Sequence, residues 1–381
     1  MLEGYLSTLF LIGSIYGFSG FLKKILGQSK EIFNIDYIYG LLFLTIISLF
    51  LNLFLPLKYF SLFFLLIGFI LFLNFVWLKY FRLNFYILFL ITFVIVFISH
   101  NNGVTYDSQL YHLQLLQLNS NYKSIFGIAN LQPHYAMNSS WHSLLGLINL
   151  KLLNVNFADL ANLSILIIFI NESLINHFHK KNKLLSSFFL LLTVLYILIY
   201  SFFHPYGNGT ILNLLGSPEA DLSSAIFFII SIYLLIKYYE DPKKQILNLI
   251  LISSFLLITI KISYIGVFLV IIYAIFYKKY NFYFFEKLNW FLLFGSIFWF
   301  AKSFLSSGCL IFPIGFTCIP VSWSQDLIEV ESYANIVQSF ARDTPLRLNF
   351  TNFDYTLNSW QWFIPWIKEY FFETEFLLVS F

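Results

Sequence analysis

Two short segments of this 381-residue sequence hold carboxylates beside hydroxyl, amide and imidazole groups, a combination that can transfer protons. The first segment, YDSQLYH, contains Asp107 and His112 and follows a long apolar run. The second, SPEAD, contains Glu219 and Asp221 and comes directly before another apolar run. Carboxylate oxygens with this spacing can also hold a divalent cation such as Mg²⁺ or Mn²⁺.

Asp107 begins a segment, 106–119, whose leucines recur close to helical spacing, which predicts an amphipathic helix lying on a membrane surface. An aspartate in this position can cap the helix. It can also accept a proton from a hydroxyl, and the two roles are compatible. His112 is a second candidate for acid–base chemistry. The alternative is a purely structural role, which is the more common one for a single histidine near an interface.

A second polar stretch, GIANLQPHYAMNSSWHSLLG, interleaves neutral hydrogen-bonding groups with aromatic rings, a combination that suits sugar hydroxyls and C–H faces. The candidate sugar-binding residues are Tyr106, Asn130, His134, Asn138 and Trp141. The alternative is an aromatic belt at the membrane–water interface with Asn138 capping the next helix.

Two lysines stand out because they lie next to or within apolar runs. Lys261 separates two such runs, and Lys302 lies near the end of a later one. Each could bind an anionic group such as a lipid-linked phosphate. The alternative for Lys261 is a basic residue that marks a tight external turn.

The two cysteines of the chain, Cys309 and Cys318, flank a segment that contains proline and glycine. Two cysteines allow a single pairing. If this loop faces an oxidising compartment, we expect a disulfide that closes it.

The elements that must position these residues are apolar helices in a membrane. The chain is 59% hydrophobic and 11% charged, with a mean hydropathy of +0.78. A water-soluble fold could not bury this much apolar surface, so we expect the lipid bilayer to be a partner. The net charge of +3 gives no reason to expect nucleic acid.

Spanning helices need roughly 20 apolar residues, and the sequence predicts an all-α, polytopic bundle with about 11 of them. The runs are 3–22, 37–57, 59–78, 84–99, 157–176, 184–203, 221–238, 246–260, 263–277, 289–304 and a last one from Phe376. The stretch 139–155 is short and amphipathic, which predicts an interfacial or re-entrant segment. Because the last run stops at the chain end, we expect either a fragment or a helix that ends abruptly.

Basic residues predict the orientation of the bundle. Most lysines and arginines fall in alternate connections, which should be cytoplasmic. The other side then receives the N-terminus, Lys58, the segments 100–156, 204–220 and 305–373, and the turn at Lys261. A site at Asp107 would face outward from the cytoplasmic membrane.

We expect three parts of the chain. Residues 1–99 form N-terminal membrane helices that look like an added bundle, 100–304 form a membrane core with external loops 100–156 and 204–220, and 305–381 form an external loop and the start of another helix.

Taken together, YDSQLYH, GIANLQPHYAMNSSW, SPEAD, IKIS and SGCLIFP resemble the GT-C class of membrane glycosyltransferases. They resemble more closely a family of bacterial polytopic proteins associated with surface-polysaccharide synthesis. The resemblance covers about residues 100–325. It implies a GT-C-like core in which Asp107 is the catalytic base or orients the acceptor, and Asp221 assists or binds a metal ion.

The resemblance implies an enzyme in the bacterial cytoplasmic membrane with its active side facing the periplasm. It would transfer a sugar from a polyprenyl-phosphate donor to a glycan or lipid acceptor, so no nucleotide site is needed. The alternatives are a polysaccharide polymerase or ligase of the same pathway, a transporter or flippase of lipid-linked glycans, and a membrane scaffold without chemistry.

Overall fold

The computed structural model describes residues 1–28, 35–74, 84–99, 105, 107–152, 154–178, 191, 194, 214–277, 286–342 and 356–367. Most of these residues are in helices, which confirms the predicted all-α class. The exception is a short hairpin in which β1 (Lys151–Leu152) pairs antiparallel with β2 (Val155–Asn156).

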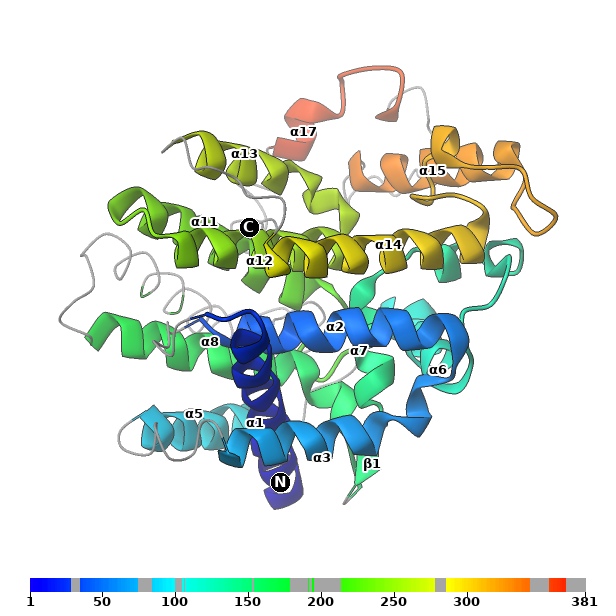
Figure 1. Ribbon diagram of the computed structural model, residues 1–381. Helices are drawn as coiled ribbons and strands as arrows, with labels where there is room; N and C mark the ends of the chain where they lie inside the picture. Colours follow the sequence, from blue (N-terminus) through cyan, green and yellow to red (C-terminus); the bar gives the residue numbers. More distant parts are fainter. Residues whose placement is uncertain are drawn as a thin grey trace. The chain divides into compact units, whose positions relative to one another are not determined.

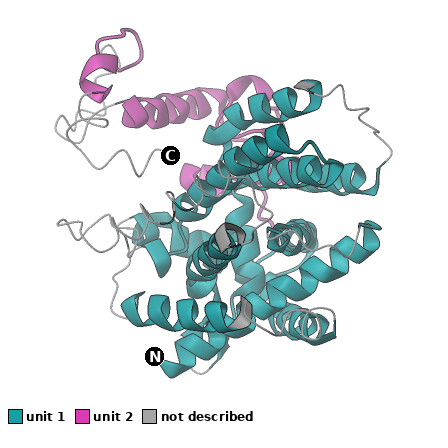
Figure 2. Ribbon diagram, turned by 90° about the vertical axis from the view of Figure 1, so that its left-hand side faces the viewer, with its two compact units in different colours: residues 1–123, 139–298 teal, residues 124–138, 299–381 magenta. Residues whose placement is uncertain are grey.

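The chain forms two compact units, which Figure 2 shows in separate colours. Unit 1 contains residues 1–123 and 139–298, and unit 2 contains residues 124–138 and 299–381. Residues 1–99, expected to form an added bundle, therefore belong to the same unit as the helices that follow Asp107.

The α-helices of unit 1 are α1 (Leu2–Ile25), α2 (Tyr37–Phe54), α3 (Ser61–Phe72), α5 (Asn84–Ser99), α6 (Leu113–Asn121), α7 (Ser140–Ile148), α8 (Ala161–Phe178), α11 (Asp221–Glu240), α12 (Lys244–Ile260), α13 (Phe268–Tyr277) and the first part of α14 (Lys287–Ser307). Shorter turns of helix are η1 (Leu57–Tyr59), the π-helix η3 (Ser108–His112), η6 (Phe157–Leu160) and η7 (Ile262–Val267). Unit 2 contains the end of α14, η4 (Ile128–Asn130), η5 (Pro133–Ala136), η8 (Gly315–Thr317), α15 (Leu327–Arg342) and α17 (Phe363–Ile367).

Each predicted apolar run within the described residues coincides with a helix, while 184–203 lies almost entirely outside them and the run from Phe376 wholly so. Five described helices are long and apolar enough to cross a membrane: Leu2–Ile25, Tyr37–Phe54, Phe157–Ile175, Asp221–Glu240 and Lys287–Ser307. Four shorter apolar helices are Ser61–Phe72, Tyr86–Ser99, Lys244–Ile260 and Ile262–Phe276. These helices are consistent with a membrane protein, and the described residues do not confirm the predicted number of about 11 spans.

The α1 helix is central to unit 1, because it packs against α2, α3, α5 and α8 (Figure 1). Two glycines allow its neighbours to approach closely. A Cβ atom on Gly17 would overlap the backbone of Gly68 in α3, and one on Gly40 would overlap the carbonyl of Ile15 in α1. Small residues at such contacts are typical of helices that associate within membranes, since close packing replaces the hydrophobic effect there.

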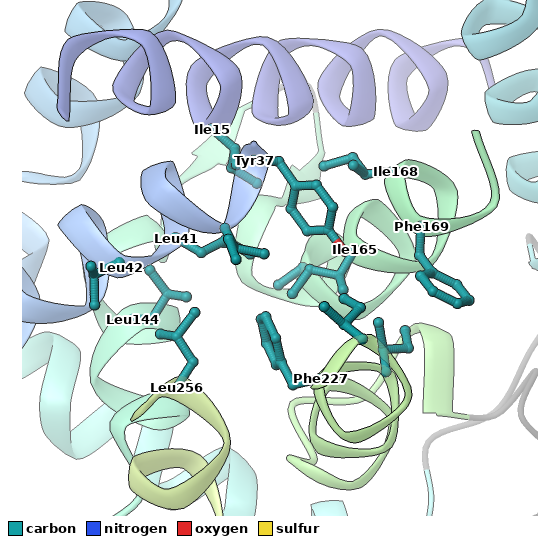
Figure 3. Close-up of a cluster of buried hydrophobic side chains, with 14 of the residues drawn as sticks. Ile15, Tyr37, Leu41, Leu42, Leu144, Ile165, Ile168, Phe169, Phe227 and Leu256 are labelled. Carbon is teal, nitrogen blue, oxygen red and sulfur yellow. The ribbon is translucent and has the colours of Figure 1, made fainter. Parts of the chain in front are cut away.

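The core of unit 1 lies where α1, α2, α7, α8, α11 and α12 meet (Figure 3). Side chains from these helices include Ile15, Tyr37, Leu41, Leu144, Ile165, Phe227 and Leu256. All nine residues of α7 are buried. The helix α7 therefore lies inside unit 1, because its neighbours cover every face. The prediction of an interfacial position for 139–155 is wrong for α7. The alternative prediction, a re-entrant segment, still fits.

Hydrogen bonds and ion pairs join helix connections that are far apart in the sequence. Asn52 donates to the carbonyl oxygens of Asn119 at 3.0 Å and Tyr122 at 3.1 Å, and Lys58 donates to Asn121 at 3.1 Å. Lys58 and the three partner residues belong to segments predicted to be external, while Asn52 lies within the predicted apolar run 37–57. Among the connections assigned to the cytoplasm, Lys287 donates to the carbonyl of Ile25 at 3.3 Å, and Lys244 pairs with Glu286 at 2.5 Å.

Unit 2 contains a disulfide between Cys309 and Cys318. The two cysteines also form an isolated antiparallel bridge, and the backbone N–H of Leu310 donates to the carbonyl of Thr317 at 3.1 Å. Cys309 belongs to a small core with Phe312, Val330 and Tyr333. The disulfide therefore closes a loop that packs against α15.

We expect the Cys309→Ser/Cys318→Ser double variant to lower the free energy of unfolding of unit 2 by roughly 2–3 kcal/mol. The cysteines are 9 residues apart, and closing a loop of this length restricts the unfolded chain by about that amount. Chemical unfolding of detergent-purified protein, followed by tryptophan fluorescence, measures the change. A reducing agent should reproduce it in the wild type and leave the double variant unchanged. Equal unfolding midpoints for the two proteins would contradict the prediction.

Candidate active site

Asp107 lies at the start of an irregular helix. The π-helix η3 follows it directly and continues as α6. The Asp107 side chain is exposed and makes no capping hydrogen bond. Capping therefore does not account for this carboxylate. Single π-helical turns are rare in proteins and frequent at functional sites, because they reposition the side chains of a helix.

Glu219 is the buried carboxylate of the site, with 5% of the residue exposed. It accepts hydrogen bonds from the hydroxyl of Thr105 and from that of Ser108, the latter at 3.0 Å. The Ser217 hydroxyl bonds to that of Ser108 and accepts the backbone N–H of Glu219 at 3.1 Å. The SPEAD segment and the start of the Asp107 helix are therefore joined through three hydroxyl groups.

Burial raises the pKa of Glu219 to about 7. The hydrogen bond from Ser108 opposes this shift, and the negative charges of Asp221 and Asp107 add to it. This mutual influence means that the three carboxylates share one electrostatic neighbourhood. A carboxyl group with a pKa near 7 gains and loses its proton at neutral pH.

Asn162, in the first turn of α8, fixes the backbone that carries Glu219. Its side-chain amide donates to the carbonyls of Glu219 at 2.8 Å and Ser217 at 2.9 Å, and lies 3.2 Å from that of Leu214. Because loop backbone needs partners when it is buried, this amide holds the turn before α11 in one conformation.

Asp221 and Lys261 form an ion pair in which both side chains are somewhat less than half exposed. Burial by itself would lower the pKa of Lys261, but pairing with Asp221 outweighs burial and raises it. Lys261 is therefore a stable cation beside the carboxylates. Its partial exposure leaves it within reach of an incoming anion.

The arrangement brings Asp107, Glu219 and the Asp221–Lys261 pair into one electrostatic neighbourhood of unit 1. Chemically, an exposed carboxylate can accept a proton from a hydroxyl group, and an adjacent cation can stabilise negative charge on a departing phosphate. Asp107 and Lys261, which would supply these two functions, lie 154 residues apart in the sequence.

His112 and His142 form a buried pair. The Nδ1 atom of His112 lies 2.8 Å from Nε2 of His142, and the two rings are stacked with their centroids 4.9 Å apart. Since His112 is 7% exposed, its ring faces the interior and not the outer surface that carries Asp107. A direct catalytic role for His112 is less favoured by this geometry than a role in holding η3 against α7.

Trp141 does not have the position expected of a sugar-binding residue. It is completely buried in α7, next to His142, and its ring belongs to the core of unit 1. A substrate could not stack on this ring in the described conformation. Tyr106 lies outside the described residues.

The other predicted sugar-binding residues belong to unit 2 and make local contacts. The Asn138 amide donates to the carbonyl of Trp299 at 2.6 Å, and Asn130 donates to that of Trp323 at 2.9 Å. His134 packs edge-to-face against Tyr333. These contacts stabilise the fold of unit 2. Lys302 is also in unit 2 and is 9% exposed.

The donor set around Glu219 and Asp221 does not match a divalent cation. The Asp221 carboxylate is paired with Lys261, and the Glu219 carboxylate accepts hydroxyl groups. No three His, Cys, Asp or Glu side chains form a metal-binding group within the part of the chain that the structure describes. The predicted Mg²⁺ or Mn²⁺ site therefore has no support in this arrangement.

Sequence reasoning missed the hydroxyl groups of Thr105, Ser108 and Ser217, and the amide of Asn162. Glu219 was predicted to be a metal ligand, whereas the structure shows a buried carboxylate that accepts hydrogen bonds. A usable signal was present: Ser217 precedes Glu219 by two residues, and serine in that position commonly accepts a backbone N–H in a turn.

A family model described as "Domain of unknown function (DUF8201)" matches residues 1–381. No curated protein and no solved structure matches the chain.

Proposed function

We propose that this chain is a membrane glycosyltransferase that uses a polyprenyl-phosphate-linked sugar donor. The chain belongs to the DUF8201 family. The acceptor is a cell-surface glycan or lipid. The observation that carries the proposal is that the negative charge of the exposed Asp107 carboxylate acts on the buried Glu219, which in turn acts on the cationic Lys261 of the Asp221–Lys261 pair.

The proposed reaction is a single displacement. An acceptor hydroxyl oxygen attacks the anomeric carbon of the sugar, and the bond between this carbon and the phosphate oxygen breaks. The phosphate oxygen keeps the electron pair, while Asp107 accepts the proton of the hydroxyl. Lys261 stabilises the negative charge on the departing polyprenyl phosphate.

Glu219 has a positioning role in this mechanism. Its ionised carboxylate accepts the hydroxyl groups of Thr105 and Ser108, which flank Asp107 in the sequence. A carboxylate that reacts with a hydroxyl must lie within hydrogen-bond distance of it, so an error of 1 Å in its position is costly. Glu219 therefore fixes the start of the helix from which Asp107 reaches the acceptor.

The proposal includes about 11 crossings with a GT-C-like core and an active end on the periplasmic side of the bacterial cytoplasmic membrane. The basic connections support this orientation, because lysine and arginine are enriched on the cytoplasmic side of membrane proteins. The grouping of Lys58 with Asn121, and of Lys287 with Ile25, supports the same alternation.

We expect Lys261→Gln to weaken the binding of undecaprenyl phosphate by about 10- to 100-fold, because a hydrogen bond to a charged group contributes about 1.5–3 kcal/mol. Isothermal titration of the detergent-purified protein with this lipid measures the affinity. Lys58→Gln is the matched control, since Lys58 is an exposed cation bonded to Asn121. Equal affinities for the wild type and Lys261→Gln would contradict a phosphate-binding role.

The experiment that tests the function is deletion of the gene, followed by sugar and linkage analysis of the surface glycan. We expect one sugar residue to be missing and its polyprenyl-phosphate precursor to accumulate on the outer leaflet. The wild-type gene should restore the sugar, and Asp107→Asn at equal protein level should not. An unchanged glycan would refute the transferase, and accumulation of the precursor on the inner leaflet would favour a flippase instead.

A further inference from the structure

Unit 1 contains a cavity of about 270 Å³ between α1, α3 and α5, and none of the described residues that line it belongs to the candidate active site. Its walls include Leu6, Phe10 and Gly13 of α1, Phe69 of α3 and Leu88 of α5. The rings of Phe10 and Phe69 lie 4.7 Å apart, so aromatic faces form part of the wall.

The wall of the cavity is almost wholly hydrocarbon. Tyr16 supplies the single hydroxyl group among the lining side chains, and this hydroxyl donates to Glu172 of α8 at 2.6 Å. Water needs two to four polar partners to remain in a buried site, so an apolar cavity of this kind stays free of water. An apolar cavity of about 150 Å³ already takes up benzene, and this one is larger.

The surface around the cavity is apolar as well. Ile70 of α3 is 54% exposed, and on α5 Leu90 is 65% and Phe93 is 52% exposed. The α1 helix is long and apolar enough to span a membrane. The medium that meets this face is therefore the hydrocarbon of a bilayer, and the most concentrated molecules beside the cavity are phospholipid acyl chains.

We propose that this cavity is a binding site for one acyl chain of a bilayer phospholipid, which inserts between α1, α3 and α5. Within the part of the chain that the structure describes, no charged side chain lines the cavity, so none there selects a particular headgroup. The occupancy of the cavity depends on the concentration of the acyl chain in the bilayer and on the apolar surface that the acyl chain buries. An α-helix is about 10 Å wide, too large for this volume, so a second protein chain does not fit.

The test uses the full chain, reconstituted in phosphatidylcholine vesicles that contain phosphatidylcholine with a diazirine in the middle of one acyl chain. The protein is then extracted into detergent, which exchanges loosely held lipid, and is illuminated. Peptide mass spectrometry locates the labelled residues. We expect label on cavity residues such as Phe10 and Phe69, and loss of label from Leu90 and Phe93, which face the bilayer. Equal labelling of the two groups would overturn the proposal.

Leu6→Trp fills the cavity from a position that is 49% exposed, and should abolish cavity labelling. Leu90→Trp, a substitution of the same size outside the cavity lining, should leave it unchanged. Excess phosphatidylcholine without the diazirine, added to the wild-type protein before illumination, gives a test that needs no variant, and it should remove the cavity label by competition. Cavity label that this lipid does not remove, or persistent labelling in a folded Leu6→Trp protein, would overturn the assignment.

Discussion

Asp107→Asn is expected to slow sugar transfer by about 10²–10⁴-fold, the usual contribution of a positioned general base. Asparagine keeps the size and polarity of the side chain but cannot accept the proton of the acceptor hydroxyl. Because the Asp107 side chain is exposed and does not cap its helix, the substitution should leave the fold intact. The initial rate of sugar transfer in membrane vesicles, normalised to protein level, measures the effect.

Glu331→Gln is the matched control for this variant, because Glu331 is an exposed carboxylate on α15 in unit 2. Its transfer rate should equal that of the wild type. A fully active Asp107→Asn protein would remove Asp107 from the reaction. A variant that is inactive because it fails to fold would show itself by an altered elution volume and a lower unfolding temperature.

Glu219→Gln is expected to lower the transfer rate by up to about 100-fold, the cost of misplacing a reacting group by about 1 Å. It should also change the dependence of the rate on pH. In the wild type the rate should rise through pH values of about 7, because the ionised Glu219 carboxylate accepts both Thr105 and Ser108. The variant, whose amide does not ionise, should lack this rise. A rise with an unchanged midpoint in Glu219→Gln would contradict the positioning role.

The same substitution should have the opposite effect on stability. Folding raises the pKa of Glu219 from 4.5 to about 7, so the folded state holds the proton more tightly than the unfolded chain does. Stability therefore falls as the pH rises from about 4.5 to about 7, and the loss above pH 7 is roughly 3 kcal/mol. Glu219→Gln should remove this loss, and its unfolding temperature should exceed that of the wild type at pH 8 and match it at pH 4.

If Glu219→Gln lowers the transfer rate but raises the unfolding temperature at pH 8, Glu219 is a group that serves function and lowers stability. If Glu219 had a purely structural role, Glu219→Gln would lower both the transfer rate and the unfolding temperature. Measuring both in the same preparations at pH 4, 7 and 8 therefore separates the two interpretations.

Much of the fold followed from the sequence. Uninterrupted apolar runs predicted helices such as α1, α2 and α11, because hydropathy alone identifies segments suited to lipid. The same reasoning did not predict the burial of α7. Its residues Ser140, His142 and Ser143 are polar, and their burial depends on helices from distant parts of the chain.

The candidate site was predicted in part. Asp107, Asp221 and Lys261 were singled out because charged groups beside apolar runs are costly unless they have partners. The pairing of Asp221 with Lys261 could not be predicted, since it joins residues 40 positions apart. Trp141 was misassigned, because a tryptophan at a membrane interface and one in a core have the same local sequence signature.

The central claim is that the carboxylates act on the outer side of the membrane, and side-specific labelling of Gln109→Cys tests it most directly. Gln109 is exposed on the same helix turn as Asp107, and the two native cysteines are held in a disulfide. A membrane-impermeant maleimide applied to intact cells should label this cysteine. It should label Lys243→Cys, on the predicted cytoplasmic side, only after permeabilisation. Labelling of Gln109→Cys that requires permeabilisation would contradict the account.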